Sequence, residues 1–369
     1  MNNRQSIISA VAVLIGTTIG AGFLGIPHVI SKSGFIPGFF LLILVAIFML
    51  VMKLYLGEII LRTNGNHQLT GYAEKYLGKK EKILMFLSMI FGIYSALLAY
   101  LIGEGESLSY LFGINMPLFF SLLFWCLMLF LTYLGLKALK KYEKLAMLLV
   151  FLLVFLIFVF YFKDVKPENL SYINKKNLFA PFGVILFSFL AFSAMPEVKR
   201  LLYGNENKMK KVIFIGVLIP MIVYSLFSFV IVGNFGGGVK EIATLNLVRF
   251  FSLLGIITMF TAYFALTIAI RDMFRFDFNF SRINGWLAAN IIPLLLFLLV
   301  YFFKLASFTK ILSISGIISA GLTGILILLM NKNAKILGKR KPEYALHINW
   351  KIIAILSVLF ILAIVMEFL

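Results

Sequence analysis

Residues 16–27 read GTTIGAGFLGIP, and this stretch carries the strongest structural signal in the sequence. Glycine occupies positions 16, 20, 22 and 25, and Pro27 follows them within one apolar segment. Glycine has little helical preference and proline removes a backbone hydrogen bond, so a helix built from this segment can be interrupted near its middle. A second reading stays open, because Gly16 and Gly20 also have the G-x-x-x-G spacing that lets two membrane helices pack closely.

Within this stretch, residues 20–25 (GAGFLG) match the pattern G-x-G-x-x-G of dinucleotide-binding loops. That loop needs a β-strand before the glycines and an acidic residue about 20 positions after them. Here an apolar segment precedes the glycines, and the first acidic residue after them is Glu58. The match is therefore accidental, and the sequence also lacks the G-x-x-x-x-G-K-[ST] loop of nucleoside triphosphatases.

A second copy of the pattern lies in the other half of the chain. Residues 22–27 (GFLGIP) and 191–196 (AFSAMP) both read small, Phe, any residue, small, aliphatic, Pro. The copies fall in the first and sixth apolar spans, so equivalent segments cross the membrane in opposite directions. Interrupted helices at matching positions of inverted halves are typical of secondary transporters, which bind substrate there. We predict interruptions near residues 20–23 and 189–193, adjacent and antiparallel.

The composition places the chain in a lipid bilayer. Of its 369 residues, 62% are hydrophobic and 13% are charged, whereas soluble domains carry about 25% charged residues. Stretches of about 20 apolar residues, enough to span the hydrocarbon core, recur along the whole length. We predict an all-α membrane protein forming one domain over residues 1–369. Its eleven expected spans are 6–30, 37–61, 83–111, 118–136, 143–162, 179–202, 211–233, 245–271, 284–303, 306–330 and 351–368.

The net charge of +19 reflects orientation in the membrane rather than a nucleic-acid partner. A nucleic-acid surface needs basic residues clustered on one face, and here they are distributed among short loops. With the N-terminus inside, 24 of the 34 Lys and Arg residues lie at cytoplasmic ends and loops and 8 lie outside. The positive-inside rule predicts a cytoplasmic N-terminus and an external C-terminus. The external loop 163–178, with four lysines, opposes this trend locally.

Neither an enzyme nor a metal centre is expected. His28, His67 and His347 lack metal-ligand spacing, and Cys126 is the single cysteine. The acidic residues are too few and scattered for a catalytic site. The first span is expected to stay in the mature protein, because it is long and ends in PHVISKSG rather than in a small-residue cleavage site.

Four segments together carry a resemblance to a known family: GTTIGAGFLGIPHVISKSGFIPG in the first span, YLIGEGESL at the end of the third, FSFLAFSAMPEVKRLL in the sixth and FTAYFALTIAIRDMF in the eighth. With these, the sequence resembles the amino acid/auxin permease family of the APC superfamily, and within it the bacterial aromatic amino acid permeases. The resemblance extends over essentially the whole chain. It implies the LeuT-type fold, with inverted five-helix repeats over residues 6–162 and 179–330 and an extra helix over 351–368.

The resemblance also implies where a substrate binds. Amides at the first break would receive the substrate carboxylate, and carbonyls at the ends of the half-helices would receive its ammonium. Helix electrostatics favours the same arrangement, because a helix N-terminus attracts an anion and exposed carbonyls attract a cation. The residues predicted to bind substrate are Ala21 and Gly22 through their amides, Thr17, Thr18, Phe187 and Ser188 through their carbonyls, and Gly20, Phe189 and Ala191 beside them.

A cation gradient is expected to drive transport, since no nucleotide-binding motif is present. The resemblance implies a sodium site between the first break and the eighth span, where oxygen atoms suit a hard cation. Its ligands here would be the carbonyls of Gly16 and Ile19 and the side chains of Thr258 and Thr261. Some proton-coupled relatives are thought to replace that ion with a lysine of the fifth span. In this chain that span has lysine only at its ends, Lys144 and Lys163.

Three charged side chains within or next to the spans receive separate predictions. Glu104, in the sequence GEGE, is the protonatable residue for the alternative in which a proton replaces sodium. Glu197 follows the proline of the sixth span and is predicted to form an inner-gate ion pair with Lys199 or Arg200. Lys53 lies about two turns from the cytoplasmic end of the second span and is expected to extend toward that surface.

The sequence therefore predicts a secondary active transporter of amino acids in the cell membrane. It would work by alternating access, with substrate bound at the breaks of the first and sixth helices. The alternatives are a proton-coupled permease and a non-transporting sensor or channel of the same fold. The expected partners are an amino acid and the lipid bilayer, without nucleic acid, and a monomer is expected. No cofactor is expected apart from sodium as the coupling ion.

Overall fold

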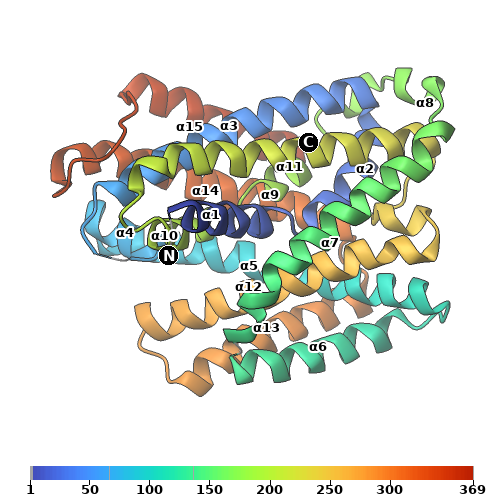
Figure 1. The fold of residues 1–369 in the computed structure, drawn as a ribbon, viewed down its shortest axis with the longest axis horizontal. Helices are drawn as coiled ribbons and strands as arrows, with labels where there is room; N and C mark the ends of the chain where they lie inside the picture. Colours follow the sequence, from blue (N-terminus) through green and yellow to red (C-terminus); the bar gives the residue numbers. More distant parts are fainter. Residues whose placement is uncertain (1–2, 66, 136, 369) are drawn as a thin grey trace.

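The computed structural model describes residues 3–65, 67–135 and 137–368, and these residues form α-helices and short 3₁₀ turns without a β-strand (Figure 1). Helices are the expected result, because a chain in hydrocarbon must satisfy its backbone hydrogen bonds within each segment. The helices are α1 Asn3–Thr18, α2 Gly22–Ser33, α3 Phe35–Leu61, α4 Leu69–Tyr76, α5 Lys79–Phe112, α6 Pro117–Leu134, α7 Lys137–Tyr161, α8 Pro167–Ser171, α9 Phe182–Ser188, α10 Met195–Leu201, α11 Met209–Phe235, α12 Ser252–Asp277, α13 Arg282–Phe303, α14 Phe308–Leu337 and α15 Trp350–Phe368.

Membrane-spanning segments account for most of these helices. In the described residues, nine segments are long and apolar enough to cross a membrane, and α1 with α2 passes the same test as one bent pair. Helix α15 coincides with the predicted span 351–368. The prediction of an all-helical membrane protein is confirmed, whereas the count of eleven spans and the orientation stay predictions.

The predicted span 245–271 is wrong at both ends, since α12 begins at Ser252 and continues to Asp277. The residues before it form the 3₁₀ turns η6 Ala243–Asn246 and η7 Arg249–Phe251. The Asn246 side chain accepts a hydrogen bond from the Lys240 amide (2.7 Å) and donates to the Gly238 carbonyl (3.0 Å). These bonds close a loop that packs on α2, so no helix begins there.

Helix α14 lies at the centre of the bundle, where it packs against α5, α9 and α3. About three quarters of its most apolar stretch is buried (78%), compared with 22% in α13. A side chain added at Gly316 would lie 2.7 Å from the Phe187 amide nitrogen, so glycine lets α14 touch the backbone of α9. Peripheral helices expose large apolar side chains such as Phe130, Phe160 and Phe302, which suit contact with lipid.

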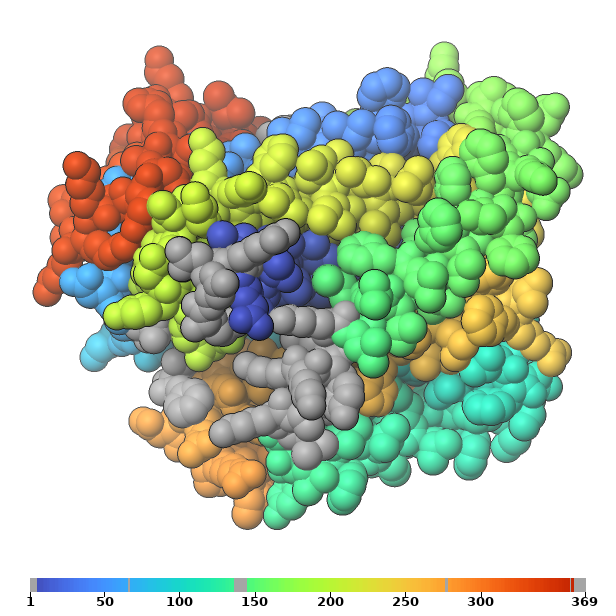
Figure 2. All heavy atoms as spheres, viewed as in Figure 1, coloured from blue at the N-terminus to red at the C-terminus, as the bar shows by residue number. Residues whose placement is uncertain are grey.

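Helix α1 lies between the bundle interior and one face of the molecule. Figure 2 shows dark blue atoms of α1 between the yellow-green atoms of α11 and the green atoms of α7. The residues that follow α1 are deeply buried, with Ile19 and Ala21 at most 4% exposed. The break between α1 and α2 therefore lies inside the protein.

A buried carboxylate joins three parts of the fold near the end of α3. Glu58 is fully buried and accepts hydrogen bonds from Arg62 Nε (2.9 Å) and from the Leu346 amide (2.8 Å). Lys335 Nζ of α14 lies 3.6 Å from Glu58 Oε1. These contacts hold residues 338–349, which connect α14 to α15, against the end of α3.

Candidate functional site

The first break interrupts the helix of the first span. Helix α1 ends at Thr18 and α2 begins at Gly22, and the two axes differ by 52°. The Ile19 amide still donates to the Ile15 carbonyl (2.7 Å), but the Gly20 amide turns back to the Thr18 carbonyl (3.0 Å). The regular helical hydrogen bonding stops there, and the predicted interruption is confirmed, beginning one residue earlier than expected.

The break leaves backbone groups without the partners that a continuous helix would give them. In the described backbone, the carbonyls of Gly16 and Thr17 and the amides of Gly22 and Phe23 make no hydrogen bond across the break. Carbonyls at a helix C-terminus carry partial negative charge and amides at an N-terminus carry partial positive charge. The break therefore presents an acceptor end and a donor end close together.

The second break lies in the sixth span. Helix α9 ends at Ser188, and α10 begins at Met195 after the 3₁₀ turn η3 Phe192–Ala194. Ala191 has a left-handed backbone with φ of 42°, a conformation that costs a non-glycine residue about 1–2 kcal/mol. The predicted interruption near residues 189–193 is confirmed.

The two breaks face each other in an antiparallel arrangement. Helix α1 packs against α10, and α2 packs against α9. A Cβ atom added at Gly22 would lie 2.9 Å from Phe187 Cδ1 and 3.0 Å from Ser188 Cα. The glycine therefore permits a contact between the start of α2 and the end of α9 that no larger residue would allow without displacement.

Tyr224 of α11 links the carbonyl ends of the two half-helices. Its hydroxyl lies 2.8 Å from the Thr18 carbonyl and 3.0 Å from the Ser188 carbonyl, and its single O–H proton is shared between these two acceptors. Its ring is fully buried and stacks on Phe23, with ring centroids 5.9 Å apart. Tyr224 therefore holds the ends of α1 and α9 at a set separation.

We expect Tyr224→Phe to preserve the fold and weaken substrate binding. The ring contacts remain, but two buried carbonyls lose their donor, which costs about 1–3 kcal/mol, or roughly a tenfold or greater loss of apparent affinity. Concentration-dependent uptake into proteoliposomes measures this effect. Tyr263→Phe is the matched control, since Tyr263 is also fully buried and its hydroxyl has no partner among the described residues. Equal affinities in the two variants would contradict the role assigned to Tyr224.

Lys53 contradicts its sequence-based expectation. It does not extend to the surface: its side chain is fully buried, and its ammonium donates to Thr18 Oγ1 at 3.5 Å. Residues 55–61, the remaining turns of α3, are all buried, partly beneath the connection 338–349. The surface is therefore out of reach, and the polar end of α1 supplies the available acceptor.

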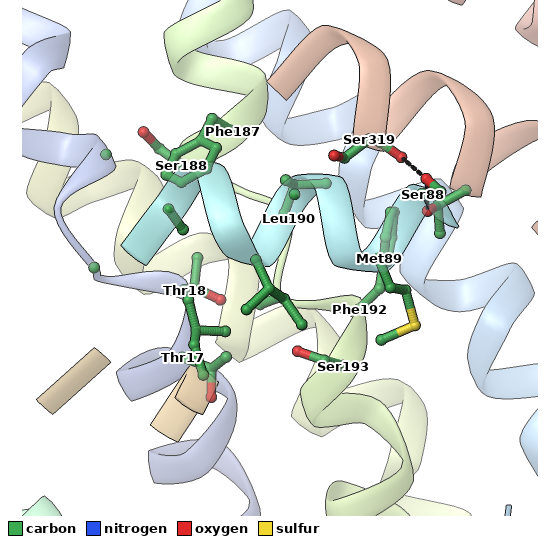
Figure 3. A pocket seen from close by; sticks show the side chains of 18 of the residues that line it. Thr17, Thr18, Ser88, Met89, Phe187, Ser188, Leu190, Phe192, Ser193 and Ser319 are labelled. Carbon is green, nitrogen blue, oxygen red and sulfur yellow. Dashed lines mark hydrogen bonds between the residues drawn. The ribbon is translucent and has the colours of Figure 1, made fainter. Parts of the chain in front are cut away.

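A cavity of ≈ 100 Å³ lies beside the two breaks (Figure 3). Figure 3 shows Thr17 and Thr18 at one side of it and Ser88 with Ser319 at the other. Near the break, a Cβ atom at Gly20 would lie 2.7 Å from the Tyr100 hydroxyl of α5. The described lining consists of apolar side chains, hydroxyls and glycines, and it includes no charged side chain. Charged or polar groups of a bound molecule would therefore have to form their hydrogen bonds with backbone groups and hydroxyls.

Most of the predicted substrate residues meet at this cavity. Those that line it are Thr17, Thr18, Gly20, Gly22, Phe187, Ser188 and Ala191. Ala21 lies within the break, where its backbone faces the Tyr100 hydroxyl. Phe189 turns away and packs its ring on Tyr224, with centroids 5.1 Å apart. Direct binding of substrate by these residues stays a prediction.

The predicted sodium ligands lie on two elements that the fold brings together. Gly16 and Ile19 belong to the carbonyl end of α1 and to the break. A Cβ atom at Gly20 would lie 3.5 Å from Ala262 Cβ, which places the break against the α12 turn carrying Thr258 and Thr261. Both threonine hydroxyls donate to carbonyls of their own helix, so their lone pairs stay available as ligands.

The two predicted acidic residues have different surroundings. Glu104 of α5 is fully buried, and neither of its oxygens has a hydrogen-bond partner among the described residues. Glu197 pairs with Arg200 within α10. Lys199, the other predicted partner, donates to the Thr63 carbonyl after α3 (2.8 Å). Among the residues that the structure describes, His, Cys, Asp and Glu side chains form no group of three suited to a metal ion.

Comparisons with known proteins agree with this architecture. The chain is similar over 304 residues to glutamine transporter 2 of Aliivibrio fischeri (21% identity, 77% of this chain and 78% of the relative). It is similar over 237 residues to tyrosine-specific transport system 2 of Haemophilus influenzae (25% identity, 61% and 57%). It is also similar over 121 residues to the low affinity tryptophan permease of Proteus vulgaris (31% identity, 32% of this chain and 29% of the relative).

The fold itself matches a solved transporter. The crystal structure of MhsT in complex with L-phenylalanine superposes with a TM-score of 0.67 at 16% identity and covers 98% of this chain and 97% of its own. This match confirms the LeuT-type fold. The chain is thus a multi-pass protein of the cell membrane and a transporter rather than an enzyme. Residues 3–237 match the tryptophan/tyrosine permease family, which confirms the resemblance to aromatic amino acid permeases, and this chain belongs to that family.

Proposed function

We propose that this chain is a secondary active transporter that binds an amino acid between the two helix breaks. The observation that carries the proposal is the meeting of the breaks, with the start of α2 against the end of α9 and Tyr224 bridging Thr18 and Ser188. Family membership supports amino acid transport. The contacts between the two breaks support a substrate site there.

A zwitterion suits this place without any charged side chain. The substrate carboxylate would accept hydrogen bonds from the amides of Ala21 and Gly22 at the start of α2. Its ammonium would donate to carbonyls at the ends of α1 and α9, such as those of Thr17 and Phe187. Both interactions use helix-end groups, and their attraction for a charged group is stronger in a buried, water-poor site than in water.

The substrate side chain would occupy the apolar part of the cavity. Ile93 and Ala96 of α5 and Phe192 contribute apolar surface there, with Leu266 of α12. The named relatives include tyrosine and tryptophan transport proteins, and the solved neighbour holds L-phenylalanine. We propose an amino acid with an aromatic side chain as the substrate, and a monomer with inverted repeats over 6–162 and 179–330 as the transporting unit.

Sodium is proposed as the coupling ion, bound by the Gly16 and Ile19 carbonyls with Thr258 and Thr261. The contact of the break with α12 supports this choice, since a Cβ atom at Gly20 would lie 3.5 Å from Ala262, the neighbour of Thr261 in the chain. A proton carried by Glu104 is the alternative, and it has support from the fully buried carboxyl group. Sodium coupling would make transport depend on Thr258 and Thr261, whereas proton coupling would make it depend on Glu104.

Uptake of a panel of labelled amino acids into proteoliposomes tests this function, with sodium and proton gradients imposed separately. We expect accumulation that requires sodium, is abolished when choline replaces it, and falls at least about tenfold in Thr261→Ala because a hard cation loses an oxygen ligand. Uptake that follows a pH gradient without sodium, and is lost in Glu104→Gln but not in Thr261→Ala, would assign coupling to the proton. Binding without flux would indicate a sensor.

A further inference from the structure

Lys53 is a fully buried lysine without a carboxylate partner among the described residues. Its side chain is fully buried, and its ammonium donates to Thr18 Oγ1 at 3.5 Å. In the described part of the chain, Lys53 forms no salt bridge and Thr18 is its single hydrogen-bond partner. A buried ammonium is costly unless nearby groups compensate its charge, so Lys53 can stay protonated only with another source of negative potential.

The carbonyl ends of α1 and α9 supply that potential. Thr18 is the last residue of α1 and Ser188 is the last residue of α9. The Tyr224 hydroxyl contacts both terminal carbonyls, so the two ends converge at one point. Each helix C-terminus attracts cations. Since Lys53 contacts Thr18, its ammonium lies beside this convergence.

The surrounding elements offer no competing carboxylate. Within the described residues, α1 from residue 5 onward and α9 carry no titratable side chain. Of the nearby carboxylates, Glu197 of α10 pairs with Arg200, and Glu58 of α3 itself pairs with Arg62 and lies near Lys335 of α14. Glu168 of α8, which also packs on α3, is exposed. On α11, Tyr224 acts as a neutral donor. This leaves the carbonyl ends of α1 and α9 as the source of negative potential for Lys53.

We infer that Lys53 is a built-in cation for these carbonyl ends and that it competes with the coupling cation for them. The inference rests on the proposed function, which places a cation at the carbonyls of Gly16 and Ile19, on either side of Thr18. Two positive charges near one helix end repel each other strongly in a low-dielectric interior. Lys53 would therefore weaken cation binding and so favour release of the ion in each transport cycle.

Removal of the charge by an unbranched, neutral side chain one atom shorter than lysine tests the inference. The full chain, purified in detergent as wild type and as Lys53→Met, is unfolded thermally while sodium chloride replaces choline chloride at constant ionic strength. We expect the sodium concentration that gives half of the stabilisation to fall about tenfold or more in Lys53→Met, because a repelling charge is gone. Lys53→Arg should resemble the wild type. Lys335→Met is the control, since it removes a lysine far along α14 that faces Glu58.

The outcomes separate this inference from the proposed function. Equal sodium midpoints in wild type and Lys53→Met would overturn the competition, whether or not uptake requires sodium. Sodium-specific stabilisation that arises only in Lys53→Met would support the built-in cation even if wild-type uptake ignores sodium, in which case only the sodium assignment fails. If Lys53→Met does not fold, Lys53→Gln replaces it. Neutral variants that remain unfolded in both salts would overturn the inference, since no cation could then take the place of the ammonium.

Discussion

Gly22→Val is expected to abolish substrate binding and uptake while leaving a folded protein in the membrane. A Cβ atom at this position would already lie 2.9 Å from Phe187 Cδ1 and 3.0 Å from Ser188 Cα. Valine adds two methyl groups at the contact and is stiff at χ1, so the start of α2 must move away from the end of α9. The donor and acceptor groups that would hold the zwitterion then separate.

Uptake and equilibrium binding of labelled amino acid measure the effect, and both should fall to the level of empty liposomes. Gly237→Val is the matched control, because a side chain at Gly237 would meet no atom within 4 Å. Its uptake should remain within about twofold of the wild type, as expected for a surface substitution. Wild-type affinity in Gly22→Val would show that this glycine serves packing alone, and the binding site would have to lie elsewhere.

Glu58→Ala is expected to cause the largest loss of stability among single changes outside the site. The substitution leaves Arg62, Lys335 and the Leu346 amide without their shared acceptor. Breaking a buried charge pair costs about 3–5 kcal/mol, and the connection 338–349 would lose its attachment to α3. Thermal unfolding of the detergent-purified protein should show a fall in Tm of roughly 5 °C or more.

Glu74→Ala provides the comparison for this change. Glu74 pairs with Lys82 at 2.8 Å, but its side chain is 40% exposed, and surface ion pairs contribute about 0–1 kcal/mol. Its Tm should therefore stay close to that of the wild type. A similar Tm in Glu58→Ala and Glu74→Ala would mean that the buried cluster does not stabilise the fold.

The broken helices could be predicted because their cause is local. Glycines 20 and 22 and Pro27 weaken the helix wherever it is placed, and the matching segment 191–196 reveals the second break. The spans could be predicted because hydrocarbon demands long apolar helices. The start of α12 could not, since the Asn246 side chain closes the preceding loop through bonds that apolar composition does not reveal.

The parts of the site that the sequence did not reveal depend on tertiary contacts. Tyr224 lies in an apolar helix with no pattern that distinguishes it from other tyrosines, and its role follows only from the convergence of Thr18 and Ser188. Lys53 was expected at the surface, because its distance from the end of the span suggested that it could reach water. The last turns of α3 are instead covered by a connection almost 300 residues later in the chain, which no local pattern reveals. Sequence patterns predicted the two helix breaks, whereas the positions of Tyr224 and Lys53 beside them became visible only in the structure.

A structure determined with the transported amino acid bound would show directly whether the two helix breaks hold the substrate. We expect the substrate between the two breaks, with its carboxylate within hydrogen-bond distance of the Ala21 and Gly22 amides. Its ammonium should face the carbonyls at the ends of α1 and α9. A substrate bound at the far end of the cavity, beside Ser88 and Ser319 and away from both breaks, would show that the helix breaks do not form the binding site.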